Sequence, residues 1–348
     1  MKKTASNVFA VIIIAAALGA AFYKFYYVPR AEKNVDSVKK TVDSFVAGRV
    51  LIDPLLIISR KQMGVYDLTA RMPERYTAES LQNELETGLK SLKKVRIKFS
   101  RVETDRTISL SALIETPYKV ACKLRFIKDK KPKIALILDD WGYKEKDIPY
   151  LASIKQIFTI SILPNNKFSA MADDEAYKYN KGIMLHLPME PEKKTAMEKT
   201  TILADMGAGT VKGDVSELIA VVPHLTGVNN HEGSLATSKK EIMIPVLEVL
   251  RDNNLFFIDS LTSPKTVGYK TAESLGVRWG KRDVFIDNEK KAPYVKDQLN
   301  KLAKLAKSRG WAIAIGHDDP VTLSVLARMM PELESQGIEF VYPAELMR

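Results

Sequence analysis

Three of the four histidines in this chain stand in short polar clusters that directly follow apolar runs. His186 follows Gly-Ile-Met-Leu, His231 follows Gly-Val-Asn-Asn, and His317 follows Ala-Ile-Ala-Ile-Gly. A fourth run, residues 133–138, ends in the carboxylate pair Asp139–Asp140. Aspartate and histidine bind divalent metals and exchange protons near neutral pH. The clusters therefore predict a metal site with acid–base chemistry around it.

The Asp139–Asp140 pair carries the strongest of these signals. Two adjacent carboxylates at a strand end repel each other unless a cation lies near them. They are either a structural turn pair before Gly142 or a functional pair. In the functional case one carboxylate binds the metal and the other accepts a proton from water that the metal activates.

His186 and Glu190 are spaced four residues apart, with Pro188 between them. Proline disfavours a regular helix through this segment, so we expect the two side chains to share a loop. The sequence makes His186 a candidate metal ligand. Glu190 is a candidate for substrate binding or for supporting the site.

His231 lies within a run of six polar or small residues that begins at Asn229 and ends at Ser234. It can supply a second imidazole to a metal. Asparagine side chains can orient a ligand or hold a loop through their own backbone. Asn229, Asn230 and Ser234 are therefore candidates for substrate binding or for supporting the site.

His317 comes after Gly316, which allows close approach of a substrate, and its residue type suits a general acid. Asp259 and Asp287 each end a further apolar run. Asp259 is a candidate for orienting a catalytic histidine, and Asp287 for supporting the site. Either carboxylate could instead cap the following helix.

The segment that carries these clusters alternates strand and helix signals. Apolar strand candidates recur at 134–138, 158–163, 182–187, 227–229, 255–258, 284–286, 312–315 and 339–341, with amphipathic helical stretches between several of them. Continuous apolar runs indicate parallel strands that are buried on both faces. Seven or eight such strands predict a distorted or incomplete (β/α) barrel over residues 131–348, with its site at the carboxyl ends of the strands.

The net charge of +11 resides mainly in the region before this barrel. Residues 28–132 carry 22 Lys and Arg against 13 Asp and Glu, whereas residues 133–348 carry 28 against 29. Amphipathic helix patterns at 31–48 and 77–94, followed by about three alternating segments, predict a small basic α+β domain over 28–130. We expect this domain either to bind an anionic lipid or wall polymer, or to be a solvated spacer. The near-neutral barrel and the lack of a recognition motif argue against nucleic acid.

Residues 8–27 form a mostly apolar stretch behind Lys2 and Lys3. Its length and its aromatic residues at the far end predict a transmembrane signal anchor, with residues 1–7 in the cytoplasm. The catalytic region is then expected outside the inner membrane, in a periplasmic or extracytoplasmic location. A cleaved signal peptide is the competing interpretation.

Taken in series, the motifs resemble the divergent polysaccharide deacetylase family, a branch of the NodB-like carbohydrate esterases. The motifs that carry the resemblance over about residues 133–348 are Ile-Leu-Asp139-Asp140-Trp-Gly, His186-Leu-Pro-Met-Glu190-Pro, Gly-Val-Asn229-Asn230-His231-Glu-Gly-Ser234, Ile-Asp259-Ser260-Leu-Thr, Arg282-Asp283-Val-Phe-Ile-Asp287-Asn288 and Ile-Gly316-His317. The resemblance implies an α/β fold of the distorted NodB barrel type.

The resemblance also implies roles for individual residues. Asp139 would be the base, Asp140 and His186 metal ligands, and His317 the acid. Glu190 stands where ordinary NodB-like enzymes have their second metal histidine, so the third ligand is either His231 or Glu190. The arginine motif of ordinary members is not evident.

The implied activity is metal-dependent N-deacetylation of an N-acetylated cell-envelope polysaccharide. Zinc is the expected metal, with manganese and cobalt as alternatives. The rival hypotheses are a non-catalytic protein that uses the barrel to bind a glycan or protein partner, and a hydrolase of another bond.

Overall fold

The computed structural model describes residues 36, 38–42, 58–62, 65–72, 76–90, 95–116, 120–193 and 196–348. The chain divides into two compact units, Met1–Lys130 and Lys131–Arg348. Each unit has its own hydrophobic core.

The described part of the first unit contains a five-stranded sheet and helix α3. The strands run in the order β1-β2-β5-β4-β3, and all neighbours are antiparallel except β2 and β5. Their bounds are Ile58–Gln62, Val65–Arg71, Arg96–Glu103, Thr107–Glu115 and Val120–Asp129 for β1 to β5. Helix α3, Ala78–Gly88, starts at a capping box formed by Thr77 and Ser80. Its buried Leu81 and Leu85 share a core with alternate residues of the strands. The sequence predicted this helix but only three of the five strands.

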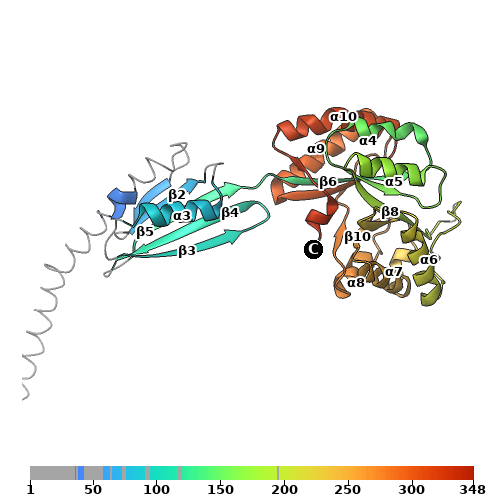
Figure 1. Ribbon diagram of the computed structural model, residues 1–348, viewed down its shortest axis with the longest axis horizontal. Helices are drawn as coiled ribbons and strands as arrows, with labels where there is room; N and C mark the ends of the chain where they lie inside the picture. The colour runs from blue at the N-terminus through green and yellow to red at the C-terminus, as the bar shows by residue number, and fades with distance from the viewer. Residues whose placement is uncertain are drawn as a thin grey trace, which may run out of the picture. The chain divides into compact units, whose positions relative to one another are not determined.

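The second unit is built around a parallel sheet in the order β11-β10-β9-β8-β7-β6-β13-β12, with β14 also paired to β6 (Figure 1). The strand bounds, from β6 to β14, are Lys133–Trp141, Thr159–Ile162, Gly182–Met189, Gly227–Glu232, Phe256–Asp259, Trp279–Lys281, Val284–Phe285, Trp311–His317 and Glu339–Phe340. No pairing joins the edge strands β11 and β12 to each other, so the sheet is curled but open. This confirms the predicted α/β class, and the predicted distorted or incomplete barrel is a curled half-barrel.

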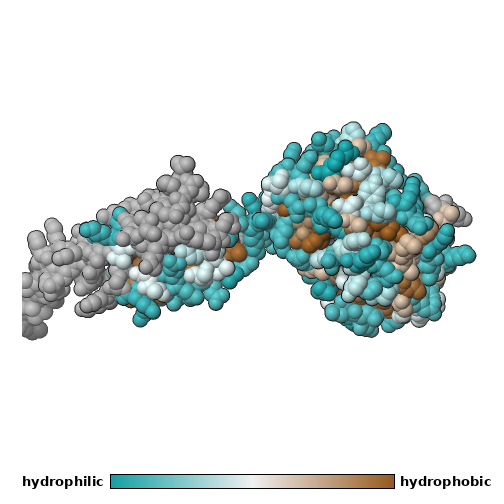
Figure 2. All heavy atoms as spheres, turned by 45° about the horizontal axis from the view of Figure 1, so that its top comes forward, coloured by the Kyte–Doolittle hydropathy of each residue, from teal (hydrophilic) through white to brown (hydrophobic). Residues whose placement is uncertain are grey.

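Helices connect the strands and cover the outer face of the curled sheet. They are α4 to α10, with bounds Pro149–Ser153, Ser169–Lys178, Ala208–Ala220, Lys240–Asp252, Gly268–Ser274, Ala292–Arg309 and Pro320–Ser335, and the 3-10 turns η4, η5 and η6 at Glu145–Asp147, Ala236–Ser238 and Pro343–Leu346. The face of this unit that Figure 2 shows is mostly hydrophilic, with separate apolar patches. The apolar residues of the strands are largely buried.

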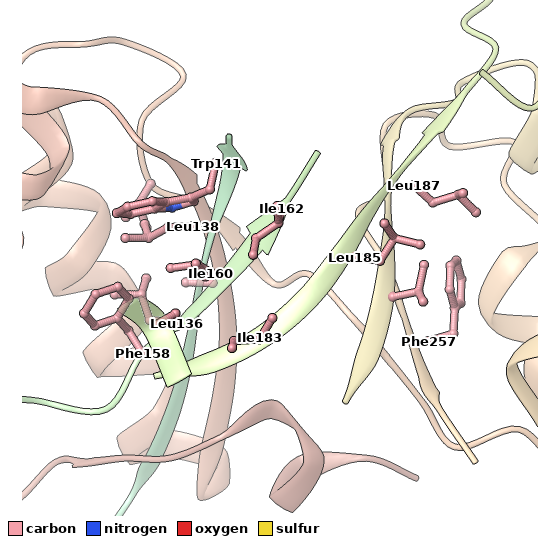
Figure 3. Packing of buried hydrophobic residues seen from close by; sticks show 14 of the residues in the cluster. Leu136, Leu138, Trp141, Phe158, Ile160, Ile162, Ile183, Leu185, Leu187 and Phe257 are labelled. Carbon is pink, nitrogen blue, oxygen red and sulfur yellow. The ribbon is translucent and has the colours of Figure 1, made fainter. Parts of the chain in front are cut away.

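Alternation along the strands divides the core into two layers. Outward-facing residues such as Leu136, Leu138 and Leu185 pack beneath the helices (Figure 3). Inward-facing residues such as Ile137 and Met184 fill the inside of the curl together with residues of β10 and β13. Successive strand residues point to opposite faces. A polar side chain two residues after an inward-facing apolar residue therefore also faces the inside of the curl, at the carboxyl end of its strand.

The predicted transmembrane segment, residues 8–27, lies outside the described residues. Within the part of the chain that the structure describes, no helix is both long and apolar enough to cross a bilayer. The longest described helix, α9, has 18 residues and carries several lysines. This finding contradicts the predicted single-pass inner-membrane location, because a spanning helix needs about 20 predominantly apolar residues.

Candidate active site

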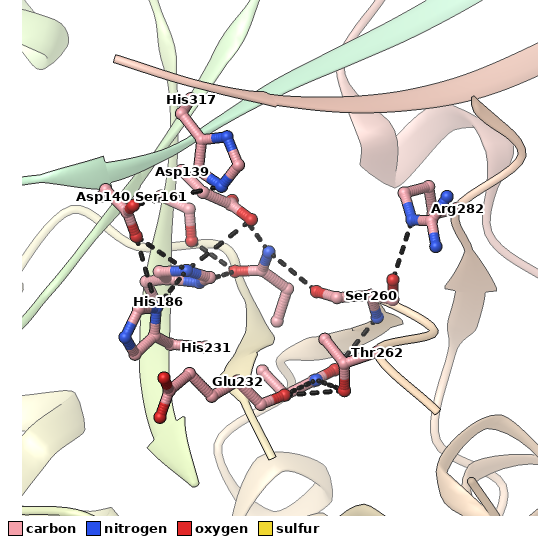
Figure 4. A network of polar contacts seen from close by, with 12 residues as sticks. Asp139, Asp140, Ser161, His186, His231, Glu232, Ser260, Thr262, Arg282 and His317 are labelled. Carbon is pink, nitrogen blue, oxygen red and sulfur yellow. Dashed lines mark hydrogen bonds and ion pairs between the residues drawn. The ribbon is translucent and has the colours of Figure 1, made fainter. Parts of the chain in front are cut away.

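The inner face of the sheet brings four polar side chains together where the strands end. Asp139 follows inward-facing Ile137 on β6, and His186 follows inward-facing Met184 on β8. The strand register places His317 beside Asp139 and Asn229 beside His186. The carboxyl edge of the parallel sheet therefore gathers carboxylate, amide and imidazole groups from four strands (Figure 4).

Asp140, His186 and His231 form a compact set of potential metal ligands, with one ligand atom from each lying within 4.8 Å of the others. Oδ1 of Asp140 lies 3.4 Å from Nε2 of His186 and 3.2 Å from Nδ1 of His231. The two imidazole nitrogens are 3.1 Å apart. This donor set, two nitrogens and one carboxylate oxygen, fits a divalent metal.

Local backbone geometry brings Asp140 into this set. Its φ is +69°, a left-handed conformation that non-glycine residues rarely adopt. The turn breaks the strand alternation, so two consecutive aspartates, Asp139 and Asp140, both reach the cluster. Oδ1 of Asp140 is buried and has no hydrogen-bond partner. A bound cation would satisfy this oxygen.

The electrostatics of the cluster favour positive charge. Burial disfavours ionised Asp140, but the adjacent imidazoles of His186 and His231 and the charge of His317 hold its pKa well below the ordinary value. Burial also lowers the pKa of His186, but the carboxylates of Asp139 and Asp140 outweigh burial and raise it. The field that attracts a proton to this imidazole equally attracts a metal cation.

Asn229 is fully buried and connects the metal cluster to Asp139. Its Oδ1 lies 2.9 Å from Nδ1 of His186 and also accepts the hydroxyl of Ser161. Because an amide oxygen only accepts, Nδ1 of His186 carries the proton and Nε2 presents a lone pair to the cluster. The amide nitrogen of Asn229 donates to Oδ1 of Asp139 at 2.9 Å and to Oγ of Ser260 at 3.2 Å. The sequence analysis named Ser260 within a motif but gave it no role, and it missed Ser161, although Ser161 is a polar residue in a short apolar strand.

Asp139 lies beside the cluster and is almost completely buried. Its Oδ2 is 3.6 Å from Nε2 of His186. Burial raises the pKa of Asp139, although the charges of His186 and His317 and the hydrogen bond from Asn229 act against it. A buried carboxylate with a raised pKa accepts protons more readily than an exposed one.

His317 faces the cluster from β13 and is oriented by Asp287. Its Nδ1 is 3.1 Å from Oδ1 of Asp287, and its backbone N–H donates to Oδ2 at 2.7 Å. Oδ2 also accepts the hydroxyl of Thr322. Nε2 of His317 points toward the site and lies 3.9 Å from Asp140. Burial alone would lower the pKa of His317, but Asp287 and the cluster carboxylates raise it to about 9.

Glu190 and Ser234 have other contacts. A carboxylate oxygen of Glu190 accepts the backbone N–H of Ala204 at 2.6 Å, which ties down the loop after β8. Oγ of Ser234 accepts the backbone N–H of Glu192 at 2.8 Å. Of the two candidates for the third ligand, the structure brings His231, and not Glu190, to Asp140.

Asp259 and Asn230 also serve local backbone structure. Asp259 follows outward-facing Phe257, so its carboxylate points away from the cluster and accepts the backbone N–H groups of Leu261 at 3.0 Å and Tyr269 at 3.1 Å. It does not contact a histidine in the structure. Asn230 joins two loops by donating to the carbonyl of Glu232 and accepting from the backbone of Ser260.

Arg282 is a further neighbour of the site that residue types alone did not single out. Its guanidinium donates to the carbonyl oxygens of Ser260 at 2.8 Å and Leu261 at 3.1 Å. Burial lowers its pKa, while the negative charges of Asp139 and Asp259 oppose that effect. Arg282 thus places a positive charge near the buried Asp139 and fastens the loop that carries Ser260.

Comparison with known proteins identifies the family. The model of the divergent polysaccharide deacetylase family matches residues 136–347. The chain belongs to this family. The resemblance noted from the motifs is therefore confirmed.

Relatives of this chain include two bacterial proteins described only as uncharacterized. YibQ of Escherichia coli K12 is 31% identical over 201 residues, which cover 58% of this chain and 63% of YibQ. A Haemophilus influenzae protein is 32% identical over 203 residues, covering 58% of this chain and 72% of that protein. The chain thus matches less than two thirds of the length of YibQ.

Among solved structures, the uncharacterized protein ATU2773 from Agrobacterium tumefaciens has a TM-score of 0.59 at 19% identity. The match covers 62% of this chain and 89% of that chain. This similarity concerns the fold.

Proposed function

We propose that this member of the divergent polysaccharide deacetylase family is a metal-dependent hydrolase that removes N-acetyl groups from an N-acetylated polysaccharide. The observation that carries the proposal is the convergence of two imidazole nitrogens on the buried Oδ1 of Asp140, which accepts no hydrogen bond from the described residues. A site of this kind, with a buried carboxylate on one side and a histidine on the other, suits hydrolysis of an amide.

Asp140, His186 and His231 would hold the metal. Three protein ligands leave further coordination positions for substrate, as catalytic zinc sites do. Zinc is our first choice because it accepts both imidazole and carboxylate ligands, and manganese and cobalt are the alternatives. A bound divalent ion supplies polarisation of the acetyl carbonyl and promotes ionisation of water.

Asp139 and His317 would move the protons. Asp139 accepts a proton from the attacking water, whose oxygen forms a bond to the acetyl carbon. The carbon–nitrogen bond then breaks as Nε2–H of His317 protonates the departing nitrogen, leaving acetate and a free amine. Asp287 holds His317 through Nδ1, so Nε2 is the atom directed at the leaving group.

The proposal is tested by metal content and by acetate release, both measured on the full chain. We expect about one divalent ion per chain in the wild type, and loss of the ion in Asp140→Asn and in His231→Ala. Glu190→Gln is the matched control and should retain metal, because Glu190 contacts the backbone of Ala204. Retention in His231→Ala together with loss in Glu190→Gln would overturn this ligand assignment.

Turnover separates the enzyme from a binding protein on the same fold. Wild-type protein loaded with metal should release acetate from N-acetylglucosamine oligomers, and Asp139→Asn should bind them without releasing acetate. If the wild type binds the oligomers but releases no acetate with zinc, manganese or cobalt, the chain is a glycan-binding member and the hydrolase proposal is wrong.

A further inference from the structure

We propose that Tyr143 and Glu198 form a binding subsite for an uncharged pyranose ring at the mouth of the metal cluster. The subsite would hold a sugar next to the one that reacts, so the preferred ligand is a neutral oligosaccharide rather than a single sugar. This inference rests on the proposed function only in assuming that the reacting sugar lies at the cluster.

Tyr143 joins two loops that follow strands at the carboxyl edge of the sheet. It lies three residues after Asp140, in the loop between β6 and η4. Its hydroxyl donates to Oε1 of Glu198, which belongs to the loop between β8 and α6. Burial and the hydrogen bond to Glu198 raise the pKa of Tyr143, and the charges of Asp140 and Glu232 contribute as well. Asp140 is a proposed ligand and Glu232 directly follows His231, so Tyr143 is close enough to the cluster to be affected by its charges.

The exposed ring of Tyr143 indicates a role in ligand binding. Tyr143 is 44% exposed, although its hydroxyl is held in place by Glu198. Among the described residues, the other exposed tyrosines lie on or just after α5, where Tyr177 stacks on His224 and Tyr179 lies beneath Lys178. Tyr143 is thus the exposed tyrosine at the carboxyl edge of the described sheet.

An exposed, orientationally fixed tyrosine ring offers a rigid amphipathic surface at low entropic cost. The C–H face of a pyranose ring is apolar and flat enough to stack on such a surface, whereas its hydroxyls need polar partners at the edge. Met197, 47% exposed and adjacent to Glu198, adds apolar surface to the same loop.

Glu198 supplies the polar partner and sets the charge preference. An ionised carboxylate has about four acceptor positions, and Tyr143 occupies one of them, so sugar hydroxyls can use the others. The carboxylates of Glu198 and Glu232, whose charges act on Tyr143, would repel an acidic sugar. A neutral N-acetylhexosamine unit combines the apolar face and the hydroxyl donors without that repulsion.

The alternative is that the Tyr143–Glu198 hydrogen bond serves only to hold two loops together. Tyr143→Phe and Tyr143→Ala separate the two roles, because phenylalanine removes the hydrogen bond and keeps the ring. A structural tie predicts similar defects in both variants. A stacking surface predicts a defect mainly in the alanine variant.

The experiment measures binding of an N-acetylglucosamine tetramer and of the monomer to the full chain by calorimetry, with metal content determined in parallel. Tyr143→Ala should weaken tetramer binding roughly tenfold while leaving monomer binding and metal content unchanged. Tyr143→Phe should stay close to wild type. Tyr179→Ala is the control for loss of an exposed tyrosine elsewhere. A tetramer of uronate residues should bind more weakly than the neutral tetramer.

Each outcome bears on the proposal separately from the hydrolase function. Unchanged tetramer affinity in Tyr143→Ala, or equal affinity for the uronate tetramer, overturns the subsite even if the wild type releases acetate. Loss of tetramer binding in Tyr143→Ala supports the subsite even if the wild type releases none. A wild type that neither binds nor hydrolyses the neutral tetramer would overturn both.

Discussion

Replacing Asn229 with alanine is expected to weaken divalent-metal binding although no metal ligand is removed. Asn229 is fully buried, and its amide contacts His186 on one side and Asp139 on the other. Without the amide oxygen, the Nδ1–H of His186 loses its acceptor, so the imidazole is no longer held with Nε2 toward Asp140. Loss of such an outer hydrogen bond to a ligating histidine typically costs about 10–100-fold in metal affinity.

The same change should also destabilise the fold. The alanine variant leaves Nδ1–H of His186 and Oδ1 of Asp139 buried without their amide partner. Each orphaned buried group costs about 1–3 kcal/mol, so the free energy of unfolding should fall by about 2–6 kcal/mol. Asn229→Asp restores an acceptor for His186 but removes the donor to Asp139 and sets a second carboxylate beside it. We expect this variant to bind metal nearly as well as wild type, and to need a higher pH for activity.

The assay is competition titration of zinc against a chelator at fixed pH, together with urea unfolding of the metal-free protein. Thr266→Val is the matched control, because it breaks a buried hydrogen bond to Asp259 at 2.8 Å that lies outside the cluster. That variant should lose stability but keep its metal affinity. Equal zinc affinity in Asn229→Ala and wild type would refute the argument that Asn229 orients His186.

Two further predictions concern protonation. If His317 is the acid, its pKa of about 9 places the alkaline limb of the kcat/KM profile near that pH, and activity is lost as the proton leaves. Asp287→Asn removes a charge that raises this pKa, so the limb should move to lower pH. A limb that does not move would contradict the assignment of His317 as the acid. Burial raises the pKa of Asp318 from 3.8 to about 7 despite its ion pair with Lys144 at 2.8 Å. The folded-state pKa is the higher one, so stability from this carboxyl is full below about pH 4 and is lost as pH rises toward 7. Urea unfolding at pH 5 and pH 8 should show wild type losing up to about 3 kcal/mol relative to Asp318→Asn; a pH-independent difference would show that Asp318 titrates normally.

Much of the second unit could be predicted from periodicity. The apolar runs that mark β6, β8 and β13 are long. Each ends in an aspartate or histidine, which is costly to bury in a hydrophobic core without a hydrogen-bond or charged partner. The short strand β11 was missed because three residues, Trp279–Lys281, carry too little pattern. The half-barrel could not be separated from a closed barrel, since closure depends on pairing between edge strands far apart in the chain.

The identities of the chemical groups and the family were determined by the sequence itself, because residue types and their order are local properties. The choice between His231 and Glu190 as the third metal ligand was not determined by the sequence. Glu190 comes just after β8, and its carboxylate turns onto the backbone of Ala204. His231 lies within β9, where the register with β8 pairs it with Pro188, two residues after His186, and its Nδ1 reaches Nε2 of His186. Asp259 and Asn229 show the same division. Alternation in the folded strands directs Asp259 outward and Asn229 inward, and which face is inward is decided only when the distant strands pair and the sheet curls.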